Sequence, residues 1–399
     1  MIGLEGILTK EQVMFRDDIR NFVGQNLAPI AQEMYVANSN DTYKMDEGLL
    51  LQIGKDKLHG TGIPKDFDGM GLGVVERIIL NEEFGYEDLS TALMFVTTGI
   101  FANAIQFFGT NAQKQKYLRE IANGAVCSFF LSEPGSGSDA FGSIQTRLER
   151  KGDSYYMTGS KTWGTNGAIA KYALVFLKSE GRVKAVIVPN AALNNGHGYN
   201  DYTLIRKMGL LSSSTILVSF DNLQIPPDAV FGADGAEIAR TLLYLSRLEI
   251  AAQALGAARR YIKEVQSAVK EREAYMDEPV KRVLYHKISE YIGRINVATL
   301  SLYKSAIELA KDNFEPYKAS ISKLAKGRFE PYKASISKFD CSEILADAAN
   351  DFSSLFYGRV PFGSIADRIQ RDSPVYKIFE GASEIQLNTI AETKLHLPK

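Results

Sequence analysis

The spacing of apolar residues changes twice along this chain, and that change limits the possible folds more than any other feature. Apolar residues return every three or four positions from Thr9 to about Gly124, which is typical of helices. Short β-prone runs bounded by Gly, Pro, Asn and Asp follow, at residues 129–131, 154–158, 172–177, 183–188 and 216–220. The helical spacing returns beyond Gly235. The sequence therefore predicts an α+β protein with a helical domain at 1–124, a β-barrel or sandwich domain at 125–234 and a helical bundle at 235–399.

The last domain contains two long helices and an internal repeat. Pro279 is the only proline between Gly235 and Asp312, which leaves room for two long helices. Residues 314–323 recur identically at 329–338. An insertion of this length would turn the buried face of a helix by roughly 60°. We therefore expect the extra copy to leave the bundle as a loop or short helical excursion opened by Pro316 and Pro331.

Charge and cysteine content narrow the class of protein. The 46 Lys and Arg residues nearly balance the 47 Asp and Glu residues, so nucleic acids and anionic membranes are poor partners. Cys127 and Cys341 are the only cysteines, which is too few for a disulfide framework and favours a reducing compartment. The first residues lack a basic segment followed by an apolar core, and we expect no uncharged run of 18 residues that could span a membrane. The sequence therefore predicts a soluble cytoplasmic protein.

Several common kinds of site have no support in the sequence. The four histidines lie far apart and in no metal-binding pattern, so no metal site is predicted. The glycines at 135, 137 and 142 do not have the spacing of a dinucleotide-binding loop, and no P-loop sequence occurs. A Rossmann or P-loop nucleotide site is therefore not expected.

Residues 129–139 are the first segment that could bind a ligand. A β-prone run that includes Phe129 and Leu131 ends in a turn with two glycines. There the backbone can approach a ligand closely and present N–H groups and hydroxyls to it. An ordinary Gly- and Ser-rich surface loop explains the same pattern.

Trp163 is the only tryptophan of the chain, and it lies two residues before Thr165 in a segment flanked by glycines. On a strand the two side chains would share a face, so the indole could lie against a flat heterocycle while the hydroxyl reaches one of its edge atoms. A core tryptophan beside a turn is equally compatible with the pattern.

Glu380 is the candidate catalytic carboxylate. It follows an apolar pair that ends in Phe379 and precedes Gly381, where a helix begins with Ser383 as a possible N-cap. A carboxylate held between Phe379 and a ligand loses solvation, so its pKa rises and it becomes a better proton acceptor near neutral pH. A solvated glutamate beside a helix start is the simpler alternative.

Together and in this order, these segments resemble those of the acyl-CoA dehydrogenase family. The likeness runs from about Thr9 to Leu395 and is strongest in five collinear motifs, at residues 132–139, 161–167, 207–222, 247–256 and 371–386. The resemblance implies an FAD enzyme with an N-terminal helical domain, a middle β domain and a C-terminal four-helix domain. It also implies a homotetramer, or a homodimer, whose flavin lies between subunits.

The resemblance further implies roles for individual residues in binding FAD. Leu131 and Ser132 would hydrogen-bond the pyrimidine edge of the flavin. Trp163 would pack on the isoalloxazine ring and Thr165 would bond near N5. Arg272 would hold the FAD pyrophosphate of a neighbouring subunit. The implied cofactor-binding set also contains Phe129, Ser138, Tyr275, Ala382 and Glu384.

On the substrate side, the resemblance implies that Glu380 is the base. Its carboxylate would take the α-proton from one face of an acyl thioester while flavin N5 takes the β-hydrogen as hydride on the other. Its backbone N–H and a flavin ribityl hydroxyl would stabilise the enolate charge. The implied substrate-binding residues are Ser138, Arg247, Phe379 and Gly381.

Some assignments stay open at this point. Certain family members carry the base at the position of Ser246, where a serine cannot serve, and Glu249 is the nearest rival carboxylate. The substrate could be an acyl-CoA, or an acyl or aminoacyl group tethered to a carrier protein. The electron acceptor could be an electron-transfer flavoprotein or oxygen. The non-enzymatic alternative is a scaffold that binds FAD with a degenerate site.

Three departures from the family pattern concern the outer FAD contacts. The Gly-Gly pair of the family is not recognisable in residues 355–359, Val283 stands in place of a glutamine, and Ala382 stands in place of a threonine. Cofactor binding could therefore be weaker or differently arranged.

Overall fold

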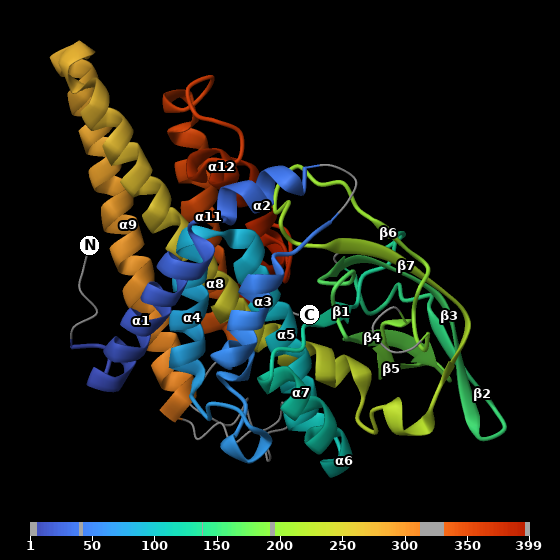
Figure 1. Ribbon diagram of the computed structural model, residues 1–399. Coiled ribbons are helices and arrows are strands. Elements are labelled where there is room, and N and C mark those ends of the chain that lie inside the picture. Colours follow the sequence, from blue (N-terminus) through green and yellow to red (C-terminus); the bar gives the residue numbers. More distant parts are fainter. Residues whose placement is uncertain (1–5, 40–42, 138, 192–195, 312–330, 396–399) are drawn as a thin grey trace.

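The computed structural model describes residues 6–39, 43–137, 139–191, 196–311 and 331–395. Figure 1 shows a helical block beside a curled sheet, with helix α8 running from the edge of the sheet through the helical block. Within the described residues every named strand lies between Cys127 and Ile225, with helices before and after it. The predicted α+β fold class is confirmed.

The N-terminal helices begin where the sequence supplies capping side chains. Thr9 caps α1, because its hydroxyl accepts a hydrogen bond from the Gln12 N–H at 3.3 Å while the Gln12 side chain accepts one from the Thr9 N–H at 3.0 Å. Thr110 and Gln113 form the same arrangement at the start of α6. The longer elements are α1 (Lys10–Phe22), α2 (Ala31–Ala37), α3 (Glu47–Lys55), α4 (Val74–Glu87) and α5 (Leu89–Phe108). The shorter ones are η1 (Val23–Leu27), η2 (Leu58–Gly60), η3 (Lys65–Phe67), α6 (Asn111–Gln113), η4 (Lys114–Leu118) and α7 (Arg119–Ala122).

Helix α5 corrects one expectation from the sequence. Among the described residues it is the one helix long and apolar enough, by length and composition, to cross a membrane. Leu89–Phe108 carries no charged residue, so the expectation that no such segment occurs was wrong. The helix is apolar all round because α4, α8 and strand β1 pack against it, and 83% of its most apolar window is buried inside the protein.

The middle domain is a seven-stranded sheet in the order β1-β4-β2-β3-β7-β6, with β5 paired to β4. β1 runs parallel to β4, whereas the β2–β3, β3–β7, β4–β5 and β6–β7 pairs are antiparallel. The sequence did not reveal β2, because its residues are mostly charged and only Leu148 is buried. The strands are β1 (Cys127–Phe130), β2 (Arg147–Lys151), β3 (Ser154–Thr165), β4 (Tyr172–Ser179), β5 (Arg182–Pro189), β6 (Tyr202–Leu204) and β7 (Thr215–Ile225).

The two long helices predicted on either side of Pro279 are present as α8 (Gly235–Arg272) and α9 (Glu278–Lys311). The second copy of the repeat starts α11 (Pro331–Asp351), which packs against α8, α9, α12 (Ile365–Tyr376) and α13 (Ser383–Lys394). Pro331 is tolerated because the first turn of a helix does not need its N–H. The expected excursion falls on the first copy, which lies outside the described residues. Short 3₁₀ turns are η6 (Pro227–Ala229), η7 (Glu273–Tyr275) and η8 (Ser353–Leu355).

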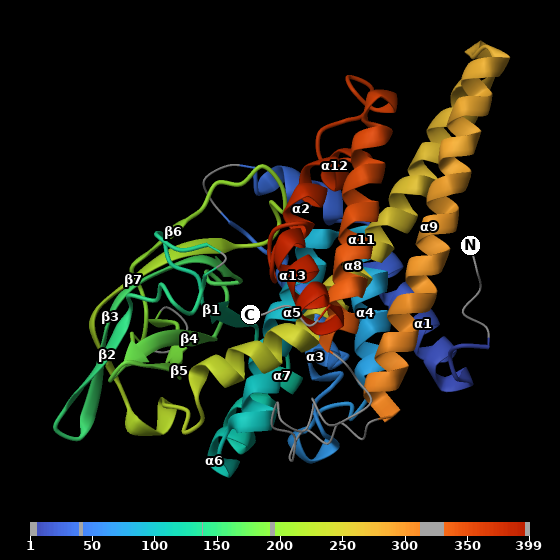
Figure 2. The same ribbon diagram turned by 180° about the vertical axis from the view of Figure 1, so that it is seen from behind.

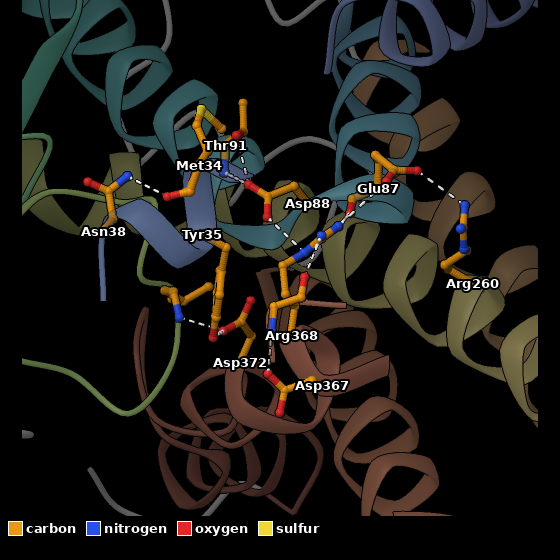
Figure 3. A network of polar contacts seen from close by, with 12 residues as sticks. Met34, Tyr35, Asn38, Glu87, Asp88, Thr91, Arg260, Asp367, Arg368 and Asp372 are labelled. Atoms are coloured by element: carbon orange, nitrogen blue, oxygen red, sulfur yellow. Dashed lines mark hydrogen bonds and ion pairs between the residues drawn. The ribbon is translucent and has the colours of Figure 1, made fainter. Parts of the chain in front are cut away.

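A buried polar junction ties the three parts of the chain together (Figure 3). On α12, one oxygen of Asp372 accepts hydrogen bonds from the Tyr35 hydroxyl of α2, at 3.0 Å, and from the backbone N–H of Leu210. One turn earlier, Arg368 donates to the carbonyl oxygens of Glu87, at 2.8 Å, and Gly363, at 3.0 Å. The start of the segment that contains Glu380 is thus fixed to the helical block and to the middle domain.

Candidate active site

Glu380 lies in the short connection between α12 and α13. Its φ is +55° and that of Gly381 is +93°, so two consecutive residues adopt the left-handed conformation. A non-glycine residue in this region stores strain of about 1 kcal/mol or more, and such residues concentrate at functional sites. The local backbone therefore supports a special role for Glu380.

Two donor groups hold the carbonyl oxygens of this turn through three hydrogen bonds. Lys338 Nζ donates to the Gly381 oxygen at 3.0 Å, and Gln386 Nε2 donates to the same oxygen at 2.8 Å and to the Glu380 oxygen at 3.2 Å. Gly381 has φ +93°, a conformation in which any residue with a Cβ would be strained, so glycine is favoured there. Among the described residues the Glu380 N–H has no hydrogen-bond acceptor, which leaves it available to a ligand.

The Glu380 carboxylate accepts a hydrogen bond of 2.6 Å from Ser246 Oγ on α8. Burial raises the pKa of the Glu380 carboxyl, and the Ser246 hydrogen bond and the positive charges of Arg247 and Lys338 oppose part of that rise. Arg247 is buried behind the site and donates from Nη1 to Ser335 Oγ at 3.0 Å. The proton affinity of the Glu380 carboxyl thus depends on its burial and on these three neighbours.

The start of α13 differs from the sequence prediction. Ser383 is not the N-cap, because α13 begins at Ser383 itself and Ala382 occupies the N-cap position without a side-chain hydrogen bond. The Ser383 hydroxyl instead donates to Glu343 Oε1 on α11 at 2.5 Å. A carboxylate from a neighbouring helix is a stronger acceptor than the turn offers, and sequence alone does not place it there.

The rival carboxylate, Glu249, is buried one turn further along α8. Its side chain is paired with the guanidinium of Arg77, which also donates to Asn103 Oδ1 at 2.8 Å. Burial raises the pKa of Glu249 to about 7, and the Arg77 charge opposes the rise. Because an ion pair already occupies this carboxylate, the geometry favours Glu380 as the base.

Trp163 and Thr165 lie at the end of β3. The β3–β7 register shifts between Lys161 and Gly164, and Trp163 within this bulge has φ +58°. Bulges redirect side chains, and the indole here is 58% exposed. Gly164 between the two is buried, with its Cβ direction closed by the Phe130 ring, so Trp163 and Thr165 both face away from the core. An exposed indole beside a hydroxyl fits a flat ring system such as the flavin.

A buried ion pair that the sequence analysis did not assign supports the segment at Leu131 and Ser132. Lys161 Nζ contacts Glu133 Oε1 at 2.8 Å and donates to the Leu131 oxygen at 3.0 Å. The Ser132 oxygen accepts from the Thr162 N–H at 2.9 Å. A lysine inside an otherwise β-prone run was the available signal for this contact.

The remaining predicted residues lie in three places. Phe129 packs its ring on Phe176 within the sheet, and Phe379 packs perpendicular to Tyr376 at 4.9 Å between ring centroids. Ala382 and Glu384 line a cavity of about 450 Å³ between α11, α12 and α13. Ser138 lies outside the described residues.

Arg272 and Tyr275 are not brought to the other site residues within one chain. They end α8 and form the following turn, at the tip of the α8–α9 hairpin, and Tyr275 is 90% exposed. Figures 1 and 2 show this tip projecting away from the sheet. A contact between these residues and a flavin at Trp163 therefore requires a second subunit.

Comparison with known proteins assigns the whole chain to one family. Family models of the acyl-CoA dehydrogenase N-terminal, middle and C-terminal domains match residues 9–125, 128–223 and 233–395. An acyl-CoA dehydrogenase of Bacillus subtilis is 31% identical over 95% of this chain and 96% of its own length. A short-chain specific acyl-CoA dehydrogenase of Clostridium acetobutylicum is 29% identical, with the same coverage.

Solved structures agree with this assignment. Butyryl-CoA dehydrogenase from Megasphaera elsdenii has a TM-score of 0.83 and 27% identity, covering 97% of this chain and 99% of that one. A chain from a study of the electron transferring flavoprotein of Acidaminococcus fermentans has a TM-score of 0.84 and 28% identity, covering 98% and 99%. The chain therefore belongs to the acyl-CoA dehydrogenase family, and it is an FAD-dependent oxidoreductase that desaturates an acyl thioester.

Proposed function

We propose that Glu380 is the base that removes the α-proton of the acyl thioester. The observation that carries this proposal is the strained Glu380–Gly381 turn, in which the carboxylate is held by Ser246 while the backbone N–H stays unpaired among the described residues. One residue can thus accept the α-proton through its side chain and stabilise negative charge on the thioester oxygen through its N–H. Bound FAD supplies the acceptor for the β-hydride.

The other residues of the site would orient the flavin and the substrate and keep water out. Trp163 would lie against the flavin, with Thr165 and the Leu131–Ser132 backbone at its polar edges. Phe379 would line the acyl slot and keep water from the carboxylate, which favours a high proton affinity. Arg247 lies buried behind Glu380 and stabilises its ionised form. Ala382 and Glu384 would contact the outer part of the cofactor from the cavity that they line.

The acyl group would be carried by coenzyme A and the electrons would pass to an electron-transfer flavoprotein. The similarity to acyl-CoA dehydrogenases over nearly the full length of the chain supports the first part, and the relative from the flavoprotein study supports the second. We propose a cytoplasmic location on the basis of the two unpaired cysteines.

The chain would act as a homotetramer in which the α8–α9 tip of one subunit reaches the flavin of another. Support comes from large apolar side chains exposed around that tip and along α9, namely Tyr275, Val280, Val283, Tyr285, Val297 and Leu300. Exposed apolar surface of this kind is typical of interfaces. Sedimentation analysis of the purified protein tests the assembly.

Anaerobic reduction tests the proposed function. The purified protein is saturated with FAD, and a series of saturated acyl-CoAs is added under nitrogen while the flavin absorbance is recorded. Prompt bleaching is the expected result. Bleaching only by an acylated carrier protein would contradict the CoA assignment, and FAD binding without bleaching by either kind of substrate would favour the non-enzymatic scaffold.

A further inference from the structure

Lys338 on α11 is a fully buried lysine whose ammonium has no carboxylate partner within ion-pair distance in the described part of the chain. Its Nζ donates to the Gly381 carbonyl oxygen. Lys161, the other lysine buried to the same extent, has Glu133 at 2.8 Å. Because burying an ammonium without a paired carboxylate is costly, the position of Lys338 calls for a compensating role.

The Gly381 carbonyl does not by itself explain the lysine. Gln386 Nε2 already donates to that oxygen at 2.8 Å, so a neutral amide satisfies it. What Gln386 cannot supply is positive charge. The charged groups that face Lys338 are Glu380 in the turn, Arg247 on α8, Glu343 on α11 and Glu384 on α13. Glu380 is the largest of the attractive contributions to its charged form.

We propose that Lys338 is a positioning residue for the base: its ammonium fixes the left-handed Glu380–Gly381 turn through the Gly381 carbonyl and favours the ionised Glu380 carboxylate through its charge. Ser335 lies one turn earlier on the same face of α11 and accepts from Arg247, so α11 controls both cations behind the base. The inference rests on the proposed role of Glu380.

The electrostatic consequence has a definite sign. Removing the Lys338 charge removes one of the causes that lower the pKa of Glu380, so that pKa should rise. The remaining charged groups around Glu380 are Arg247 and Glu249 on α8. Burial lowers the pKa of Lys338 to about 8, so its charge is also lost in the unaltered protein at moderately alkaline pH.

The test compares Lys338→Met with Lys338→Gln, which keeps a donor for Gly381 but no charge, and with Lys338→Arg, which keeps the charge. Lys333→Met is the matched control, because Lys333 lies on the same helix and is paired with Glu308 at 2.7 Å. Each variant is measured for the pH dependence of anaerobic flavin reduction. Each variant is also compared by infrared difference with the same variant that carries Glu380→Gln in addition, which isolates the carboxylic-acid stretch of Glu380. This measurement does not depend on turnover.

We expect the acid limb of reduction and the infrared titration to move up together by about half a pH unit or more in the Met and Gln variants. Lys338→Arg and Lys333→Met should keep the unaltered profile. Curves that coincide with the unaltered protein in the Gln variant would overturn the charge role, even if stability falls. Failure of acyl-CoA to reduce the flavin of the unaltered protein would instead overturn the proposed function.

A measurement without any change at Lys338 covers the case in which its variants do not fold. The carboxylate stretch of ionised Glu380 in the unaltered protein should shift between about pH 7 and pH 9, as Lys338 loses its proton. A band that stays fixed through this range would contradict the proposal.

Discussion

Two carboxylates lie eight residues apart in the same C-terminal segment, and they have different surroundings. Asp372 is almost fully buried, and one of its oxygens accepts hydrogen bonds from two other parts of the chain. Glu380 is partly exposed and accepts a hydrogen bond from the Ser246 hydroxyl of α8. The cations Arg247 and Lys338 lie near its carboxylate. Burial raises the pKa of both groups.

The comparison shows that a raised pKa does not identify a base. Asp372 has no access to a ligand, and its bonds join α12 to α2 and to the middle domain, so its role is to assemble the fold. Glu380 lies in a left-handed turn between α12 and α13, where the residue is partly exposed and its backbone N–H is unpaired among the described residues. Geometry therefore separates the structural carboxyl from the catalytic one.

Removal of the Asp372 side chain should give the largest effect on stability. Asp372→Ala leaves the Tyr35 hydroxyl and the Leu210 N–H buried without an acceptor, so the free energy of unfolding should fall by about 2–4 kcal/mol. Denaturant unfolding measures the change. Any variant protein that still folds should retain flavin reduction, and an activity loss without a stability loss would reverse the roles that we assign to the two carboxylates.

The same residue predicts a pH dependence of stability. Burial raises the pKa of Asp372 to about 7 from an ordinary value of 3.8. Between these values the folded protein holds a proton that the unfolded chain has lost, so the contribution of Asp372 to stability falls as pH rises from about 4 to 7 and is constant above 7. Asp372→Asn keeps an oxygen acceptor and cannot ionise.

As the pH rises from about 4 to 7, the free energy of unfolding of Asp372→Asn should therefore increase relative to that of the unaltered protein by about 1 kcal/mol or more. Parallel stability curves for the two proteins would show that Asp372 does not titrate there.

Loss of one hydrogen bond at the junction should cost less. Tyr35→Phe removes the hydroxyl that donates to Asp372 and keeps the ring, so the free energy of unfolding should fall by about 1 kcal/mol. The pH profile of flavin reduction should not move, because Tyr35 does not touch Glu380. A displaced profile would indicate that the junction controls the base.

Ser246→Ala should give the smallest change in free energy and a diagnostic change in pH profile. The Ser246 hydrogen bond lowers the pKa of Glu380, so its loss should move the acid limb of reduction upward by about half a pH unit. Ser305→Ala is a matched control, since that buried serine bonds only a carbonyl of its own helix, Ser301. An acid limb that shifts equally in both variants, or in neither, would remove Ser246 from the account.

The sequence predicted those features that depend on neighbouring residues. The two long helices on either side of Pro279 follow from the lack of other prolines between Gly235 and Asp312. Glu380 was also predicted, from its position after Phe379 and before Gly381 and from the resemblance to the family.

Contacts between distant residues could not be predicted in this way. Ser246 lies 134 residues from Glu380, and Lys338 lies 43 residues from Gly381. The same limit explains the error at Ser383, whose hydroxyl finds an acceptor 40 residues away on α11. Helix α5 is a different case, because its lack of charged residues can be read from the sequence and only the packing that buries it could not be predicted.

The most direct test of the account is the anaerobic reduction of Glu380→Gln saturated with FAD, with the unaltered protein beside it. The variant should bind FAD and fold normally, because glutamine has the same shape and can still accept from Ser246. We predict that acyl-CoA bleaches the flavin of the unaltered protein and leaves that of the variant oxidised. Bleaching of the variant at the unaltered rate would contradict the assignment of Glu380 as the base.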